Sequence, residues 1–147
     1  MGDMTRIRVV LDTHILVAAS RSRQGASFAV LQRLSKGGFV ALASVPLFLE
    51  YEAVLKRPAQ LAIGGRTAAM VDAFLDALSL RAEPVHLHFL WRPQTRDPAD
   101  EMVLETALNG HADALITFNL NDFSAARRFR LPVWTPSDFL AQLNLKE

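Results

Sequence analysis

The residues best suited to do chemistry follow a short apolar segment near the N-terminus. Residues 7–11 form a largely apolar, partly β-branched run that ends at Asp12 and Thr13. Such a run predicts a strand buried on both faces of a parallel sheet. Ligands of open α/β sheets bind beyond the carboxyl ends of the strands, so Asp12 is a candidate for binding or catalysis. The alternative is that Asp12 caps a helix starting near His14, because Asp is a favoured N-cap residue.

Other oxygen-bearing side chains are expected near the same edge of the sheet. Asn119 follows a second predicted strand, Asp100 lies in the first turn of a predicted helix, and Glu50 lies in the middle of another. Carboxylates that converge repel one another, and burying them unpaired is costly. Mg²⁺ or Mn²⁺ resolves this conflict, since these cations take oxygen ligands and keep several waters. A site of this kind suits phosphodiester hydrolysis.

Some of these acids also have simpler explanations. Asp100 and Glu101 in the first turn of a helix complement the helix dipole, and Asp97 before Pro98 is the expected N-cap. Glu52 has Lys56 four residues later, the spacing of a surface ion pair. Glu50 has no such partner, although both glutamates flank the apolar stripe of their helix. The missing partner favours Glu50 as the metal-binding acid.

Alternating strands and helices predict one domain over residues 1–147. The expected fold is a three-layer α/β/α arrangement with a mainly parallel central sheet. Strands are expected at 7–11, 39–43, 83–87, 113–117 and 131–134, and helices at about 14–19, 26–36, 46–57, 67–80, 98–109, 124–129 and 136–143. Residues 88–96 are expected to form a loop.

The composition excludes several classes of protein. The 147 residues carry a net charge of +1, so no global field indicates a nucleic-acid partner. There is no cysteine, which excludes disulfides, thiolate zinc sites and cysteine nucleophiles. The longest apolar run, residues 39–49, is interrupted and too short to cross a bilayer. We therefore expect a cytoplasmic protein without membrane association.

Four segments of the chain, in this order and spacing, resemble the PIN-domain family. The resemblance is to toxins of type II toxin–antitoxin systems related to the VapC ribonucleases. The segments are Val10-Leu11-Asp12-Thr13 with Ile15-Leu16-Val17-Ala18-Ala19, then Pro46 to Pro58, Arg96 to Leu104, and Ala112 to Phe123. Together they cover most of the chain, and their order is more specific than any one of them.

The resemblance implies a metal-binding set of acids and a function. It implies Asp12, Glu50 and Asp100 as metal-binding acids, with the hydroxyls of Thr13 and Thr117 close by. It also implies Mg²⁺-dependent (or Mn²⁺-dependent) cleavage of single-stranded RNA, a cognate antitoxin and a homodimer.

This chain departs from the family pattern at two positions. His14 stands where Asn is common, and a histidine at a helix start is more often structural than catalytic. Asn119 stands where an acid is common, and Asp122 follows it closely. We therefore take Asn119 as a catalytic position and Asp122 as a further metal ligand.

Two other functions were weighed against the ribonuclease. A degenerate PIN domain would bind RNA or a partner protein without cleaving RNA. A phosphatase of the haloacid dehalogenase type requires a second aspartate two residues after the first, where His14 stands, and is set aside. Candidate RNA contacts are the aromatic residues Phe118 and Trp91 and three basic clusters, which are equally compatible with packing or a solvated surface. The clusters are Arg21 with Arg23, Lys56 with Arg57, and Arg127, Arg128 and Arg130.

Overall fold

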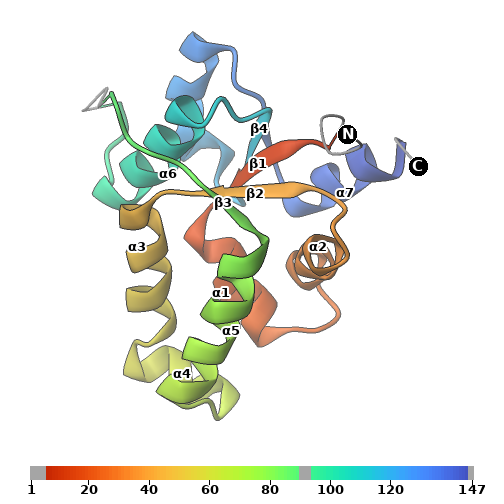
Figure 1. Cartoon of the computed structure of the whole chain (residues 1–147), viewed down its shortest axis with the longest axis vertical. Helices are drawn as coiled ribbons and strands as arrows, with labels where there is room; N and C mark the ends of the chain where they lie inside the picture. Colours follow the sequence, from red (N-terminus) through yellow and green to blue (C-terminus); the bar gives the residue numbers. More distant parts are fainter. Residues whose placement is uncertain (1–5, 90–93, 146–147) are drawn as a thin grey trace.

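A five-stranded parallel sheet forms the centre of the molecule (Figure 1). The computed structural model describes residues 6–89 and 94–145. The strand order is β3-β2-β1-β4-β5, and every neighbouring pair is parallel. The strands are β1 (Arg8–Leu11), β2 (Val40–Ala43), β3 (Ala82–Pro84), β4 (Ala114–Ile116) and β5 (Val133–Trp134). The predicted α/β fold with a mainly parallel sheet is confirmed.

Helices lie on both sides of this sheet. In Figure 1, α1, α2, α3 and α5 lie below the strands, whereas α6 lies above β2 and β3 and beside β1 and β4. The helices are α1 (Thr13–Arg21), α2 (Ala26–Ser35), α3 (Val45–Leu55), α4 (Pro58–Gly64), α5 (Ala68–Arg81), α6 (Pro98–Asn109), the 3₁₀ segment η2 (Leu120–Phe129) and α7 (Pro136–Leu145). Among the described helices, none is long and apolar enough to cross a membrane.

The two central strands are the most deeply buried elements. Val9 and Val10 of β1 and all three residues of β4 have no exposed surface. Val10 pairs with Leu115, and Leu11 pairs with Ile116, so the two strands end at the same edge. The chain leaves β1 towards β2 on one side, whereas β4 is reached from β3 at the far edge of the sheet. The carboxyl ends of β1 and β4 therefore mark the topological switch point, where open α/β sheets bind ligands.

Three elements differ from the sequence prediction. Helix α3 ends at Leu55, before the expected end at Arg57, and Pro58 begins α4, because proline is tolerated in the first turn of a helix. The strand expected at 83–87 is shorter and starts earlier, at Ala82, as an edge strand. The helix expected at 124–129 begins earlier, at Leu120, and is 3₁₀ in type. Residues 90–93 of the expected loop lie outside the described residues.

Candidate active site

Asp12 lies at the end of β1 and is almost fully buried, with 4% of its surface exposed. Its backbone N–H donates to the carbonyl of Ile116 over 2.9 Å, which continues the pairing of β1 with β4. Thr117 Oγ1 donates a hydrogen bond of 2.7 Å to Asp12 Oδ2. Asp12 occupies the N-cap position of α1, yet its side chain makes no capping hydrogen bond. The carboxylate is thus bound across the sheet by Thr117, and the backbone N–H groups of Thr13 and His14 at the start of α1 act on it more weakly.

Burial determines the acid–base behaviour of Asp12. It raises the pKa of the Asp12 carboxyl, while the hydrogen bond from Thr117 acts in the opposite direction. His14 also lowers this pKa, with Nδ1 lying 3.9 Å from Asp12 Oδ2. Beneath the site, the Tyr51 hydroxyl donates to the carbonyl of Leu11 over 2.6 Å. Burial and the charge of Asp12 raise the pKa of Tyr51, so this hydroxyl remains a neutral donor.

Asp100 lies half-buried in the first turn of α6, next to several other acids. Burial raises its pKa to about 6, and the charges of Asp12, Asp97 and Asp122 contribute to this shift in that order. His14 opposes it. The fold therefore brings four carboxylates from β1, α6 and η2 into electrostatic contact. Asp12 and Asp100 were expected to converge here and Asp122 was expected as a further ligand, whereas Asp97 was expected only as a cap.

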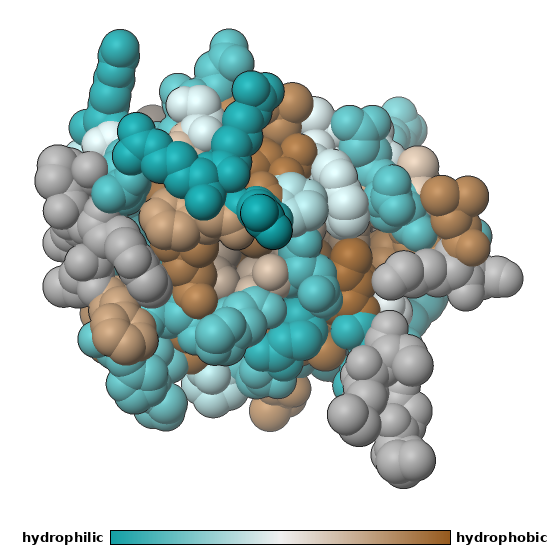
Figure 2. Space-filling model, turned by 90° about the horizontal axis from the view of Figure 1, so that it is seen from above, coloured by the Kyte–Doolittle hydropathy of each residue, from teal (hydrophilic) through white to brown (hydrophobic). Residues whose placement is uncertain are grey.

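A pocket of about 700 Å³ opens between the N-terminus of α6 and η2. It is lined by Gln94, Thr95, Arg96, Asp97, Asp100, Asn121, Asp122 and Ser124. We call it the acidic pocket. Seen from above, the side on which α6 and η2 lie in Figure 1, hydrophilic side chains cover much of the surface, with separate hydrophobic groups between them (Figure 2).

Asp97 has the capping role predicted for it and also belongs to this pocket. Its Oδ1 accepts a hydrogen bond of 2.9 Å from the N–H of Ala99, and Pro98 occupies the first turn of α6. The cap fixes where α6 begins. It thereby places Asp100 in the wall of the pocket.

Glu50 lies half-buried on α3, next to Tyr51, whose bond to Leu11 holds this turn of the helix against the end of β1. Ser44, the N-cap of α3, shares a buried hydrogen bond of 2.7 Å with Thr106 of α6. Glu50 is thus carried on a helix tied to both β1 and α6. It is not among the groups that shift the pKa of Asp100.

Glu52, the alternative to Glu50, forms the ion pair expected from its spacing. Lys56 Nζ lies 2.8 Å from Glu52 Oε2 and 2.6 Å from Asp72 Oδ1, which links α3 to α5. A carboxylate engaged in this way is a weaker candidate for a metal site. The same contacts make Lys56 a weaker candidate for a phosphate contact.

The residues around Thr117 and Thr13 complete the edge of the site. The backbone N–H of Asn119 donates to Thr117 Oγ1 over 3.1 Å, and Asn119 is exposed. Phe118 is 47% exposed. The hydroxyl of Thr13 is buried and has no hydrogen-bond partner among the described residues. Trp91, the other aromatic candidate, lies outside the described part of the chain.

The donor chemistry of this site fits a hard divalent cation. The four interacting carboxylates supply oxygen donors, and burial together with their mutual repulsion raises the pKa of Asp100. Within residues 6–89 and 94–145, however, no three His, Asp or Glu side chains are grouped closely enough to form a complete metal cage. Mg²⁺ needs no such cage, because it is commonly held by one or two carboxylates and retains waters.

Glu101 has a structural role that its sequence context did not indicate. It was expected to be one of two acids that complement the helix dipole, but it is only 5% exposed. Its Oε1 accepts hydrogen bonds from the backbone N–H groups of Gln94 and Thr95. The one signal in the sequence is its helical spacing, since Glu101 lies three residues before the buried Leu104.

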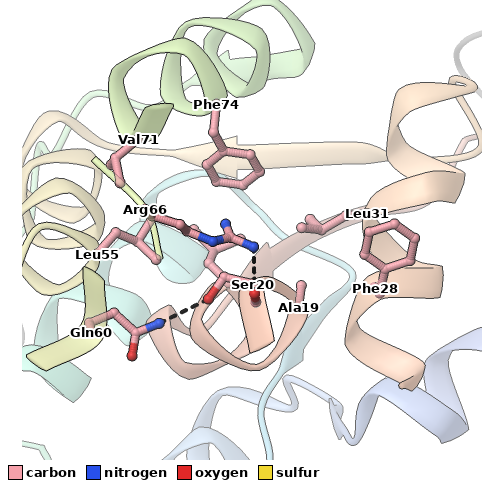
Figure 3. Close-up of a pocket in the computed structure, with 10 residues that line it drawn as sticks. Ala19, Ser20, Phe28, Leu31, Leu55, Gln60, Arg66, Val71 and Phe74 are labelled. Carbon is pink, nitrogen blue, oxygen red and sulfur yellow. Dashed lines mark hydrogen bonds between the residues drawn. The ribbon is translucent and has the colours of Figure 1, made fainter. Parts of the chain in front are cut away.

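A second cavity, of about 110 Å³, lies away from these acids, between α1, α2 and α5 (Figure 3). Leu31, Phe28 and Phe74 line it, together with the guanidinium of Arg66. Arg66 donates to the carbonyl of Ser20, and Gln60 Nε2 donates to Ser20 Oγ over 2.9 Å. Arg21, from one of the basic clusters, also binds Gln60. Through these hydrogen bonds, Gln60 of α4 and Arg66, which follows α4, bind the C-terminal end of α1.

Comparison with known proteins places the chain in a family. The PIN domain profile matches residues 8–121, so the chain belongs to the PIN domain family. A chain of the VapBC2 complex from Rickettsia felis, solved with a DNA fragment from its promoter, superposes with a TM-score of 0.61 at 18% identity over 88% of this chain and 98% of that one. A chain of FitAB bound to the IR36 DNA fragment gives 0.58 at 16% identity over 87% and 94%. No curated protein matches the sequence.

Proposed function

We propose that this PIN domain is a divalent-metal-dependent endoribonuclease that cleaves single-stranded RNA. The observation that carries the proposal is the interaction of Asp12 with Asp100 at the switch point of the sheet. The charge of Asp12, together with burial, raises the pKa of Asp100. A packed core has no need for such repulsion between carboxylates, whereas a cation would relieve it. PIN domains are, moreover, generally metal-dependent nucleases.

The proposed roles follow from where each side chain lies. Asp12, Glu50, Asp100 and Asp122 would hold Mg²⁺ or Mn²⁺, with Asn119 beside them. Thr117 orients Asp12 through its hydrogen bond to Oδ2. The bound cation would activate water and stabilise charge on the leaving oxygen. His14, at 3.9 Å from Asp12, lowers the pKa of that carboxyl and so favours its ionised form.

Single-stranded RNA suits the surface beside these acids. Phe118 is exposed directly after Thr117, and an exposed aromatic ring can stack on a base. Arg96 lines the acidic pocket and is exposed, so it can contact a phosphate next to the metal-binding carboxylates. Arg128 reaches the same pocket, where its Nη1 donates to Gln94 Oε1 over 3.2 Å.

The partners proposed for this chain are an antitoxin protein and a second copy of itself. The structural neighbours VapBC2 and FitAB, by their names, are complexes, which supports an antitoxin. Val45 and Leu49 on α3 are 72% and 57% exposed, which supports a homodimer, because exposed apolar patches often mark interfaces. We place the protein in the cytoplasm, as expected for such a pair.

A second function, RNA or protein binding without cleavage, is favoured by two observations. The described residues include no complete metal cage, and the position next to Thr117 and Phe118 carries an amide, Asn119, instead of a carboxylate. An amide oxygen can ligate Mg²⁺ but brings no charge. A chain of this kind would bind RNA with the same affinity in EDTA and in Mg²⁺, and it would leave the RNA intact.

Incubation with a labelled single-stranded RNA, with and without metal, separates the two functions. We expect cleavage in Mg²⁺ or Mn²⁺, none in EDTA, and recovery when excess Mg²⁺ is added back. Double-stranded RNA and single-stranded DNA of the same sequence serve as controls for substrate class. Cleavage that persists in EDTA would contradict the metal mechanism, and intact RNA under every condition would favour the binding function.

A further inference from the structure

The segment before α6 is held to this helix by side chains of the helix itself. At the C-terminal end of α6, Asn109 Oδ1 accepts from the N–H groups of His88 and Phe89 over 2.8 and 3.0 Å, and Asn109 Nδ2 donates to the carbonyl of Phe89 over 2.8 Å. The amide of Asn109 thus binds two N–H groups and one carbonyl of residues 88–89, much as the backbone of a neighbouring strand would. It anchors the segment before residues 90–93.

Glu101 makes the corresponding anchor at the N-terminal end of α6. Its Oε1 accepts from the N–H groups of Gln94 and Thr95, the latter over 2.7 Å. Glu101 and Asn109 are eight residues apart, so they lie on the same face of the helix. Residues 88–89 and 94–95 therefore both lie along one face of α6, anchored by two polar side chains.

The Glu101 anchor lies directly behind the acidic pocket. Gln94, Thr95 and Arg96 form one part of its wall, and Asp97 and Asp100 form the next. Thr95 Oγ1 also donates to the carbonyl of Asp97 over 3.0 Å, and Gln94 accepts from Arg128 of η2. Glu101 itself does not line the pocket. It affects the pocket only by binding the backbone of Gln94 and Thr95, which do line it.

Burying a carboxylate is costly unless it is hydrogen-bonded, so a nearly buried Glu101 needs these two N–H donors. Conversely, the N–H groups of Gln94 and Thr95 lie outside the strands and helices, so no regular backbone ladder holds them. Charge-assisted hydrogen bonds of this kind are stronger than neutral ones. Glu101 therefore supplies the hydrogen bonds that hold the backbone of this wall, and Thr95 and Arg128 add side-chain contacts to it.

We propose that Glu101 is a positioning residue that holds Arg96 where it contacts a backbone phosphate of the RNA substrate. This inference rests on the proposed function and deepens it, because it assigns a phosphate contact to the wall of the acidic pocket. Arg96 is the substrate-binding residue, and Glu101 acts only through the loop 94–96. Asn109 anchors the opposite end and takes no part in substrate contact.

The test measures RNA affinity rather than cleavage. Binding of a fluorescein-labelled 12-nucleotide single-stranded RNA is followed by anisotropy in EDTA over a series of salt concentrations. Arg96→Ala should weaken binding roughly tenfold and make the slope of log K against log salt shallower by about 0.7, as expected for one lost phosphate contact. Glu101→Ala should reproduce both changes, and Glu101→Gln, which keeps an acceptor oxygen, should restore most of the affinity.

Two further variants distinguish positioning from a general loss of structure. Asn109→Ala, the matched control at the other anchor, should leave affinity and salt slope unchanged. The double variant Glu101→Ala/Arg96→Ala should bind no more weakly than Arg96→Ala alone, because both substitutions remove the same contact. A structural role alone would give additive losses and no change of slope.

The outcomes separate this inference from the proposed function. RNA binding by the wild type, with Glu101→Ala unchanged in affinity and slope, would overturn the inference and leave the ribonuclease proposal standing. Equal weakening by Glu101→Ala and Asn109→Ala would also overturn it. If Glu101→Ala fails to fold, Arg96→Ala still tests the inference. An unchanged salt slope in Arg96→Ala would show that Arg96 makes no phosphate contact, which would overturn the inference. No RNA binding by the wild type in EDTA would overturn this inference, whereas the ribonuclease proposal is decided by cleavage in Mg²⁺.

Discussion

At the scale of single residues, Asp100 links the geometry of the site to pH. Its pKa of about 6 lies above the ordinary value of an aspartate, near 3.9. The folded protein therefore binds this proton more tightly than the unfolded chain does. The stability from this effect is fully present below about pH 4 and is lost as pH rises through about 6.

Asp100→Asn removes this pH dependence from the metal-free protein. We expect the variant to gain stability relative to the wild type as pH rises from 4 to 7, because the amide does not ionise at this partly buried position and cannot become a fourth negative charge. Urea unfolding of both proteins in EDTA at several pH values measures the difference. A difference that is constant across this range would show that the fold does not raise the pKa of Asp100.

The two neighbouring glutamates of α3 should behave differently. Glu50→Gln should lower the rate of RNA cleavage at least tenfold, because it removes a charge from a proposed metal ligand. Glu52→Gln should leave the rate nearly unchanged and cost about 0–1 kcal/mol of stability, since it breaks a partly exposed ion pair with Lys56. Parallel cleavage and melting assays compare them. Equal losses of rate would mean that Glu50 is not the metal-binding glutamate.

At the scale of secondary-structure elements, Gly110 controls how closely α6 packs on the sheet. A Cβ added there would lie 2.8 Å from Val85 Cγ2, 3.0 Å from the carbonyl oxygen of Thr106 and 3.1 Å from Leu42 Cδ1. We expect Gly110→Ala to lower the free energy of unfolding by about 1–3 kcal/mol through overpacking. Denaturant unfolding measures the loss.

Val85→Ala provides the internal control for Gly110. It removes the closest of the three contacts, so the double variant should lose less stability than the sum of the two single variants. Strictly additive losses would show that the cost of Gly110→Ala does not come from the contact with Val85.

Elements with strong local signals were predicted well from the sequence. Asp97 and Pro98 mark the start of α6, and the apolar runs of β1 and β4 place Asp12 and Thr117 at one edge of the sheet. The start of α4 was missed because a proline that ends one helix can also begin the next. The role of Glu101 was missed because its partners, two backbone N–H groups, leave no pattern in the sequence. Contacts between a helix side chain and the backbone of a preceding loop arise only from the folded chain.

At the scale of the whole molecule, the proposed homodimer can be tested through its exposed apolar side chains. We expect Leu49→Lys to shift the protein from dimer to monomer in sedimentation equilibrium, because it buries a charge in the proposed interface. Ile63→Lys is the matched control, since Ile63 on α4 is 59% exposed, close to the 57% of Leu49. A monomeric wild type, or a dimer unaffected by Leu49→Lys, would contradict this interface.

The whole fold brings Asp12 of β1 and Asp100 of α6 together at the switch point of the sheet, and the ribonuclease proposal depends on this convergence. The most direct test is the rate of single-stranded RNA cleavage by Asp12→Asn in saturating Mg²⁺, compared with the wild type. Asparagine preserves the shape of the side chain, and a catalytic metal contributes several kcal/mol, so we predict a fall of about 100-fold or more with the fold intact by circular dichroism. Cleavage by Asp12→Asn at the wild-type rate would contradict the account.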